Sequence, residues 1–475
     1  MGTGSGGEVL LQLDRTGGRA LRAQLEDGLR EAVRTGRLAP DSRLPPTRAL
    51  AADLGISRRL VVDAYAQLLA EGYLRARAGA GTFVSGAASA SEPPAAEARA
   101  RPLRFDFFPG YPDLSGFPRG QWLRALRDTL REAPDSALGY PDPRGAPALR
   151  RALAGHLRRV RGVAADPEAI VVCSGAAQAF ALIAEALRGS SMAVEDPGLP
   201  VHRTILAEHG MRLVALPVDE DGARVQELAA LAAVCPAEAP LSSVLVTPAH
   251  QSPTGVALAA ERRAALLEWA ARSGAVVVED DYDAEFRYDR APLGAMQGLA
   301  PDRVIYTGTV SKTLAPALRL GWMVLPSRML ELLARLKLMA DHGSPTLDQL
   351  ALARMLESGA YDRHLRVARR RYRSRRDALV AAVEAHLPGV RVTGLAAGLH
   401  ATVRLAEPVE GLALMAAASR HSVGVYPLGY GYIEPRPVDD GLILGYANLA
   451  EPAIEEGIRR LALALAELPP GPAAT

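Results

Sequence analysis

The sequence predicts an α/β protein in which a small helical domain precedes a larger domain built on a mainly parallel sheet. Short β-branched runs alternate with helical stretches from about residue 165 to 325, which indicates strands covered by helices on both faces. Three helical patterns and a hairpin lie before residue 86, and an Ala/Pro/Ser-rich stretch follows them. We expect domains at 1–85 and 105–475, a flexible linker at 86–104, and a division of the second domain into a large part (about 105–340) and a small part (about 341–470).

The composition is that of an ordinary globular protein. Of 475 residues, 49% are hydrophobic and 23% charged, and the net charge of +2 is too small to identify a partner. No uncharged apolar run reaches the roughly 18 residues of a membrane span, and no secretory leader is visible. The two cysteines suit a reducing cytoplasm, and no His or Cys cluster has the spacing of metal ligands. We therefore expect a cytoplasmic protein without a metal site.

The first region has the element order of a winged helix-turn-helix. Apolar residues recur at every fourth position over 20–35, which predicts a first helix. Thr47 opens a short second helix, and Ser57 caps a third. Strand-forming runs at 73–77 and 82–84 flank a glycine-rich tip and predict a β-hairpin. A third helix in this order enters the major groove of DNA near its N-terminal end.

Arginines stand where such a domain would meet DNA. Arg58 and Arg59 lie at the start of the third helix, where they can reach phosphates or guanine edges. Arg75 and Arg77 lie on the hairpin and can reach the DNA backbone or the minor groove. The alternative is a protein-binding helical module with solvated arginines, which the helical patterns alone do not exclude.

The segment from Arg43 to Leu74, followed by Gly-Ala-Gly-Thr-Phe-Val at 79–84, resembles the DNA-binding domain of GntR-type transcriptional regulators. The likeness covers nearly all of residues 18–85. It implies operator DNA as a partner. The residues expected at that DNA are Arg43, Thr47, Arg48, Ser57, Arg58, Arg59, Arg75, Arg77, Gly79 and Gly81.

Lysine is nearly absent from the chain. Of its 55 Lys and Arg residues only two are lysines, Lys312 and Lys337. A guanidinium stays protonated and cannot form a Schiff base, whereas a desolvated amine can attack an aldehyde. Lys312 is therefore a candidate for holding an aldehyde cofactor. The alternative is a surviving surface lysine, which is our interpretation of Lys337.

Polar motifs follow the predicted strands, at the edge of the sheet where such folds bind ligands. Gly175 and Ala176 open a helix, whose free N–H groups can hold a phosphate. Asp280 ends another run and can pair with a protonated pyridine nitrogen, while the hydroxyl of Tyr282 can reach a phenolic oxygen. The structural alternatives are a turn that merely connects two elements and a solvated acidic loop.

Two further side chains accompany the lysine. Thr309 and Arg319 offer a hydroxyl and a fork-shaped guanidinium, which suit a phosphate dianion. The alternative for Arg319 is a surface charge, although its neighbours are otherwise apolar.

Together these elements resemble the pyridoxal 5′-phosphate (PLP) site of the aspartate-aminotransferase fold (fold type I) over about residues 105–465. With its GntR-like head, the whole chain is similar to the MocR-type subgroup of GntR regulators. The resemblance implies an internal aldimine on Lys312, a ring-nitrogen contact from Asp280 and a phenolic-oxygen contact from Tyr282. It also implies a head-to-tail homodimer. The phosphate would be held by Gly175, Ala176, Thr309 and Arg319, with Tyr140 added from the partner subunit.

Three positions depart from the aminotransferase pattern. Leu199 stands where relatives usually place a Tyr over the cofactor ring, and it can cover that ring but cannot stack on it. Ser252 replaces an Asn, and Ile443 replaces the Arg that clamps a substrate carboxylate. Without that clamp, an α-amino acid is poorly oriented for proton transfer. We expect a regulator that senses an amine, an amino acid or PLP itself; the alternative is an active aminotransferase with an incidental DNA-binding head.

Other conspicuous residues have structural interpretations. We interpret the basic run Arg369–Arg376 as the solvated outer face of a helix rather than as a nucleic-acid site. We expect structural hydrogen bonds for His250, His342 and His400, and a core position for Cys173.

Overall fold

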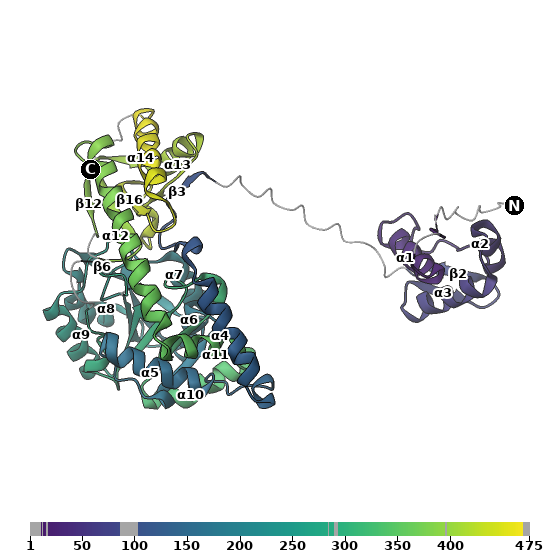
Figure 1. Cartoon of the computed structure of the whole chain (residues 1–475), viewed down its shortest axis with the longest axis horizontal. Helices are drawn as coiled ribbons and strands as arrows, with labels where there is room; N and C mark the ends of the chain where they lie inside the picture. Colours follow the sequence, from purple (N-terminus) through teal and green to yellow (C-terminus); the bar gives the residue numbers. More distant parts are fainter. Residues whose placement is uncertain are drawn as a thin grey trace. The chain divides into compact units, whose positions relative to one another are not determined.

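The computed structural model divides into two compact units, Met1–Arg101 and Pro102–Thr475. Figure 1 shows the helices and strands of each unit. Of the predicted linker, only Leu103 and Arg104 belong to the described residues, so this expectation lies almost entirely outside them. The described residues are 11, 13–15, 18–85, 103–283, 285–288, 293–394 and 397–468.

The first unit confirms the predicted helices and hairpin. Its apolar stripe buries Leu25 and Leu29 against residues of the third helix such as Leu68. The Ser57 side chain accepts a hydrogen bond from the Leu60 N–H at 3.4 Å, which caps the third helix as expected. Thr47 is the first residue of the second helix rather than a cap preceding it. The elements are α1 (Leu21–Arg34), α2 (Thr47–Leu54), α3 (Arg58–Ala70) and the antiparallel strands β1 (Leu74–Arg77) and β2 (Gly81–Val84).

The second unit is built on an eight-stranded sheet of order β4-β11-β10-β9-β8-β5-β6-β7. The run from β6 to β10 through β5, β8 and β9 is parallel, which confirms the prediction. Strand β11, which the sequence analysis did not single out, lies antiparallel between β10 and β4. The strands are β4 (Ile170–Cys173), β5 (Ser191–Asp196), β6 (Arg212–Asp219), β7 (Gly222–Ala223), β8 (Leu241–Val246), β9 (Val276–Asp281), β10 (Val304–Thr309) and β11 (Gly321–Val324).

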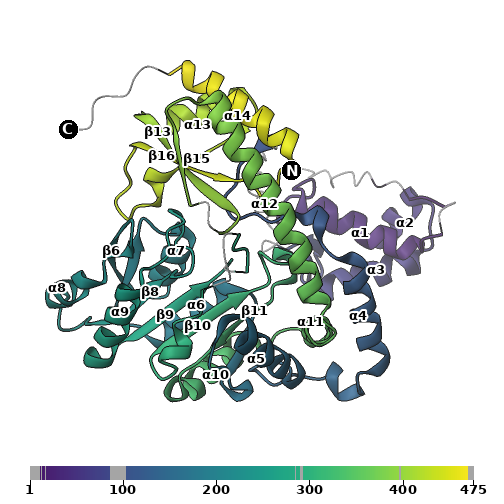
Figure 2. The same cartoon turned by 60° about the vertical axis from the view of Figure 1, so that its left-hand side comes forward.

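Helices cover both faces of this sheet, because alternate strand residues are apolar on both sides. In β9, Val276 and Val278 pack with residues of α6 and α10, whereas Val277 packs with residues of α9. Figure 2 shows β9, β10 and β11 as neighbouring strands in the middle of the unit. The helices are α4 (Arg119–Glu132), α5 (Pro147–Arg161), α6 (Ala176–Ala186), α7 (Pro200–Glu208), α8 (Leu228–Val234), α9 (Ala260–Ser273), α10 (Ser327–Asp341) and α11 (Thr346–Glu357).

The C-terminal segment forms a smaller lobe around an antiparallel sheet of order β12-β13-β16-β15 (Figure 1). The Gly398 carbonyl, just before β13, accepts hydrogen bonds from the hydroxyls of Tyr288 (2.6 Å) and Tyr446 (2.8 Å), and so joins the two parts. Strand β3 (Phe105–Asp106), expected in the large part, pairs with β14 (Val423–Gly424). The remaining elements are α12 (Ala360–His386), β12 (Arg391–Thr393), β13 (His400–Glu410), α13 (Gly411–Arg420), β15 (Tyr426–Pro427), β16 (Val438–Gly445) and α14 (Glu451–Ala466).

Two interpretations of cationic residues were wrong. Lys337 is fully buried on α10, where its ammonium donates to the Asp341 carboxylate at 2.6 Å and to Ser344 at 3.0 Å. The basic run on α12 is not merely a solvated face, because Arg371 and the buried Arg375 both pair with Asp113. In both cases a carboxylate compensates the charge, and sequence periodicity does not reveal such a partner. The core position of Cys173 is confirmed.

In the described part of the chain, no helix is long and apolar enough to cross a membrane. Within the same residues, no group of three or more His, Cys, Asp or Glu side chains is arranged to hold a metal ion.

Candidate cofactor site

Lys312 lies in the turn that follows β10, between this strand and β11. Burial lowers the pKa of its ammonium, and the carboxylates of Asp283 and Asp280 oppose that shift. The backbone at Gly110 approaches the amine closely, because a Cβ built on Gly110 would lie 3.4 Å from Nζ. Gly110 also has a φ of +70°, which favours glycine. The lysine is thus a partly desolvated amine beside two carboxylates.

Asp280 lies near the end of β9, the strand that pairs with β10. Its Oδ1 accepts a hydrogen bond from the Thr307 hydroxyl at 3.0 Å. Its Oδ2 is buried and has no hydrogen-bond partner among the described residues. Burial raises the pKa of Asp280 to about 7, and Thr307 partly opposes that increase. A buried acceptor without a donor is costly, so this oxygen suits a ligand that supplies an N–H group.

His202, which the sequence analysis missed, lies beside that oxygen. Its Nδ1 is 3.6 Å from Asp280 Oδ2, and its ring centroid is 4.2 Å from that of Phe180. Burial lowers the pKa of His202 to about 3, so the imidazole is neutral. The available signal was its position three residues after Leu199, the N-cap residue of α7, because positions three apart at a helix lie on the same side. Leu199, His202 and Ser252 line one small cavity together with Glu195.

The turn after β4 and the loop after Lys312 meet at Gly175. The Arg319 guanidinium donates to the Ser174 carbonyl at 2.6 Å. A Cβ on Gly175 would lie 2.7 Å from Arg319 Nη2, and Gly175 has a φ of +81°, which favours glycine. Ala176 begins α6 directly after it, and the Thr309 hydroxyl lies within hydrogen-bonding distance of Ser311 Oγ at 2.9 Å. The structure therefore brings Gly175, Ala176 and Arg319 together at one helix N-terminus.

Tyr282 and His250 form a second buried group near the lysine. The Tyr282 hydroxyl lies 3.0 Å from His250 Nδ1, and the same nitrogen lies 3.0 Å from Asp283 Oδ2. Burial, and then Asp283, raise the pKa of Tyr282, whereas a hydrogen bond from Ser252 opposes that shift. The expected structural bonds of His250 and His400 are present, since His400 Nε2 also donates to the Pro253 carbonyl at 3.1 Å.

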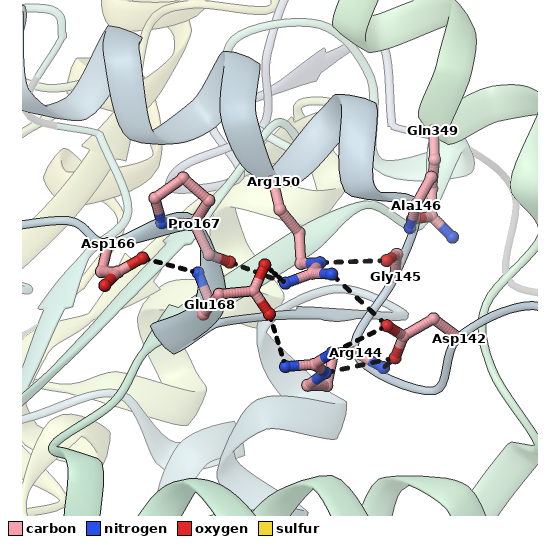
Figure 3. Close-up of polar contacts among 9 residues, drawn as sticks. All are labelled: Asp142, Arg144, Gly145, Ala146, Arg150, Asp166, Pro167, Glu168 and Gln349. Carbon is pink, nitrogen blue, oxygen red and sulfur yellow. Dashed lines mark hydrogen bonds and ion pairs between the residues drawn. The ribbon is translucent and has the colours of Figure 1, made fainter.

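Tyr140 is separate from this group and 95% exposed. The loop that follows it is fixed by the buried side chain of Arg150, which donates to the carbonyls of Gly145 at 3.2 Å and Pro167 at 2.9 Å. Arg150 also pairs with Asp142 (3.3 Å) and Glu168 (3.0 Å), and Figure 3 shows both carboxylates converging on it. The exposed tyrosine therefore extends from an anchored loop.

Ile443 lies in β16, in register with Thr402 of β13 and Tyr426 of β15, and is 9% exposed. A side chain of this kind offers an apolar surface and no donor for a carboxylate.

Most of the arginines expected at DNA are exposed, whereas one of them, Arg75, is held in an ion pair. Arg48, Arg58 and Arg59 are exposed on α2 and α3, and the Arg59 side chain is 90% exposed. Exposed Arg43 has its guanidinium nitrogen Nε only 3.1 Å from the position of a Cβ on Gly81. On the hairpin, Arg75 pairs instead with Asp41.

The remaining hairpin residues are accessible. Arg77 is exposed, with its guanidinium carbon 5.0 Å from the centroid of the Phe83 ring. Gly79 and Gly81 are exposed at the tip with φ values of +72° and +110°. Of the expected set, Thr47 is only partly exposed, and the exposed Ser57 serves as the cap of α3.

Comparison with known proteins links both units to described families. Residues 111–435 match the family model for aminotransferase class I and II, and residues 21–84 match that for bacterial regulatory proteins of the gntR family. Among solved structures, the kynurenine aminotransferase of Pyrococcus horikoshii is 28% identical, with a TM-score of 0.72, over 78% of this chain and 92% of that chain. That protein was crystallised with PMP.

Relatives that match along nearly the whole chain are named as regulators. The chain is 36% identical over 477 residues, 95% of each protein, to the probable rhizopine catabolism regulatory protein MocR of Rhizobium meliloti. It is 33% identical to the HTH-type pyridoxine biosynthesis transcriptional regulator PdxR of Corynebacterium glutamicum, over 90% of this chain and 92% of that protein. Because it joins a GntR-type DNA-binding domain to an aminotransferase-fold domain over the full length of these relatives, the chain belongs to the MocR-type subgroup of GntR transcriptional regulators.

Proposed function

We propose that this regulator binds operator DNA through its first unit and holds PLP on Lys312, so that an amine, an amino acid or PLP itself alters DNA binding. The observation that carries the proposal is the buried Oδ2 of Asp280, which has no hydrogen-bond partner among the residues that the structure describes. It lies on the strand next to the one that leads to the partly desolvated lysine.

The residues present fit this cofactor. Asp280 would accept a hydrogen bond from the protonated ring nitrogen, which would also favour the ionised form of its carboxyl group. Gly175, Ala176 and Arg319 would hold the phosphate, with Thr309 nearby. When bound, PLP supplies an aldehyde carbon that amines attack and a visible absorption band that reports on it. The lowered pKa of Lys312 increases the fraction of neutral amine available for attachment.

The kind of effector can be inferred from Ile443 in the small lobe, where the aminotransferase pattern has the Arg that clamps a substrate carboxylate. Ile443 offers no donor to a substrate carboxylate, so we favour an amine without an α-carboxylate, or the cofactor itself, as the ligand that is sensed. Whatever the effector, it must bind two arrangements of the protein with different affinities if it is to change DNA binding.

A head-to-tail homodimer would complete the site. Leu123, Leu130 and Leu138 are 67%, 57% and 68% exposed near the exposed Tyr140 in sequence, and a second copy of the chain would cover such side chains. The anchored loop of Figure 3 would then present Tyr140 to the phosphate of the partner. In the first unit, we expect Arg43, Arg48, Arg58, Arg59 and Arg77 to meet the DNA.

The test is to load the purified protein with PLP and follow the visible band. We expect a band in the wild type, a borohydride-fixed adduct on Lys312 by mass spectrometry, and neither in Lys312→Ala or Lys312→Arg. Both variants should retain basal binding to DNA upstream of the gene and lose the response to PLP and amines. A wild-type protein that stays colourless would refute the cofactor assignment. Steady turnover of an amino acid and a keto acid without DNA binding would favour the aminotransferase alternative.

A further inference from the structure

Asp283 and His250 are buried polar residues that the proposed cofactor contacts do not use. Their side chains are each 1% exposed, and they come from different segments, one after β9 and one after β8. They meet at the Tyr282 hydroxyl: His250 Nδ1 lies 3.0 Å from Tyr282 Oη and 3.0 and 3.2 Å from the two oxygens of Asp283. A buried carboxylate this close to an imidazole requires a donor from it.

The chemistry of the three groups determines where the protons lie. An ionised carboxylate only accepts hydrogen bonds, so His250 Nδ1 must carry the hydrogen that points toward Asp283. The Tyr282 oxygen lies within hydrogen-bonding distance of the same nitrogen, so it can only accept a hydrogen bond from that N–H group. The hydrogen of the Tyr282 hydroxyl is therefore directed away from His250. The Asp283 carboxylate also forms a hydrogen bond with this hydroxyl, so an anionic oxygen of a ligand would accept the hydrogen in place of that carboxylate.

The surroundings fix this arrangement. A Cβ on Gly398 would lie 2.1 Å from Cε1 of His250 and 2.8 Å from Asp283 Oδ2, so the bare backbone of the small lobe closes over both side chains. The nearby ring of His400, at a centroid distance of 5.2 Å from that of His250, uses its Nε2–H for the Pro253 carbonyl. Burial lowers the pKa of His400 to about 4, so it adds no positive charge at neutral pH.

We propose that Asp283 and His250 are positioning residues that hold the Tyr282 hydroxyl as a hydrogen-bond donor toward an anionic ring oxygen of the ligand attached to Lys312. Burial and the nearby Asp283 also keep the pKa of Tyr282 high, so the hydroxyl retains the proton that it donates. The inference rests on the proposed function, because the acceptor is an oxygen of the cofactor. It assigns a use to a histidine–carboxylate pair that would otherwise only stabilise the fold.

Two substitutions at His250 separate positioning from packing. His250→Asn removes the ring but places an amide N–H near the position of Nδ1, where it can still donate to Asp283 and Tyr282. His250→Leu removes the ring and the donor together. Both variants change the packing against Gly398, so only the donor distinguishes them.

The experiment is a PLP titration of the full-length protein, followed through the visible spectrum and borohydride fixation on Lys312. We expect His250→Leu to shift the band and raise the PLP Kd about tenfold, the effect of one hydrogen bond to a charged group. His250→Asn should keep the wild-type spectrum and a Kd within about twofold. Asp283→Asn should shift the band in the same direction as His250→Leu.

A double-mutant cycle with Tyr282→Phe tests whether His250 acts through the tyrosine. If it does, His250→Leu changes neither Kd nor spectrum further once the hydroxyl is gone. The matched control is His156→Leu, which removes another buried histidine beside a tyrosine and a carboxylate, Tyr361 and Asp362. We expect it to lower the melting temperature and leave the spectrum unchanged.

The outcomes separate the two proposals. A wild-type protein without a band or adduct overturns the proposed function, and this inference with it. A normal wild type with a normal spectrum in His250→Leu overturns the inference alone. The inference alone is also overturned if His250→Leu weakens PLP binding equally in the wild-type background and in the Tyr282→Phe background. If His250→Leu does not fold, failure of His250→Asn to retain the wild-type band, or a normal band in Asp283→Asn, overturns it.

Discussion

Arginines on α2 and α3 of the first unit differ from two buried arginines of the second unit in how their charges are used. In the first unit, Arg48, Arg58 and Arg59 are exposed, so their donors are available to a partner. In the second, Arg150 and Arg161 are each 2% exposed and bonded to carboxylates and backbone carbonyls. The difference shows that an arginine-rich composition alone says little about DNA. Exposure and spare donors distinguish the cations that can bind a partner from those that hold the fold together.

The largest expected effect comes from breaking a buried pair of the second unit. Arg161 donates to Asp281 Oδ2 at 2.6 Å, and Tyr306 donates to the same oxygen at 2.5 Å. Arg161→Ala would leave the Asp281 charge buried without its cation and should cost about 3–5 kcal/mol of unfolding free energy. Chemical denaturation measures this cost. Arg59→Ala is the control and should change stability by less than about 0.5 kcal/mol. Equal losses of unfolding free energy in Arg161→Ala and Arg59→Ala would contradict the difference between buried and exposed arginines.

Asp280 is a buried acidic residue of the second unit whose environment predicts a pH-dependent stability. Its folded-state pKa is raised to about 7, against an ordinary value of about 4. Its contribution to stability is therefore complete below about pH 4 and is lost as the pH rises through about 7. Asp280→Asn should stabilise the cofactor-free protein by at most about 4 kcal/mol above pH 8 and change little at pH 4.

Urea denaturation across this pH range checks the prediction, and loading with PLP provides the comparison. The bound cofactor should reverse the order of stability, because Asp280 then has a cationic partner. A difference between wild type and variant that is constant from pH 4 to pH 8 would contradict the assigned environment of this carboxyl group.

The exposed arginines should affect binding rather than folding. Arg58→Ala combined with Arg59→Ala removes two cations at the start of α3, so operator affinity should fall by tenfold or more (~1 kcal/mol or more per contact) and the salt slope by about 2. Fluorescence anisotropy with labelled operator DNA at several salt concentrations measures both. The melting temperature and the PLP band should remain unchanged. Operator affinity equal to that of the wild type would place the DNA elsewhere.

The smallest expected effect is at Arg75, which already has a partner in Asp41. This pair is solvent-accessible, so Arg75→Ala should cost no more than about 1 kcal/mol of stability. It should weaken DNA binding less than the α3 substitutions do. Asp41→Ala frees the arginine and should leave DNA affinity equal or higher. A large loss of affinity in Arg75→Ala would show that DNA displaces Asp41.

Local pattern was enough to predict the helices of the first unit and the parallel strands. Strand ends meet at one edge of a parallel sheet, so Gly175 and Asp280 could be assigned to the same region from sequence. The partners of Lys337 and Arg375 could not, because a buried charge and its carboxylate are matched by tertiary packing. The same holds for the pairing of His250 with Asp283, which joins segments 33 residues apart.

One backbone carbonyl links the small lobe to the large part of the second unit. The Tyr288 hydroxyl on the Gly398 oxygen would need a new acceptor if the lobe shifted away from the Tyr288 segment, since a buried hydroxyl left without one is costly. Tyr446 travels with the lobe and can keep its bond, whereas Tyr288 cannot. A separation of the two parts would therefore break the Tyr288 contact with this carbonyl and leave the Tyr446 contact in place.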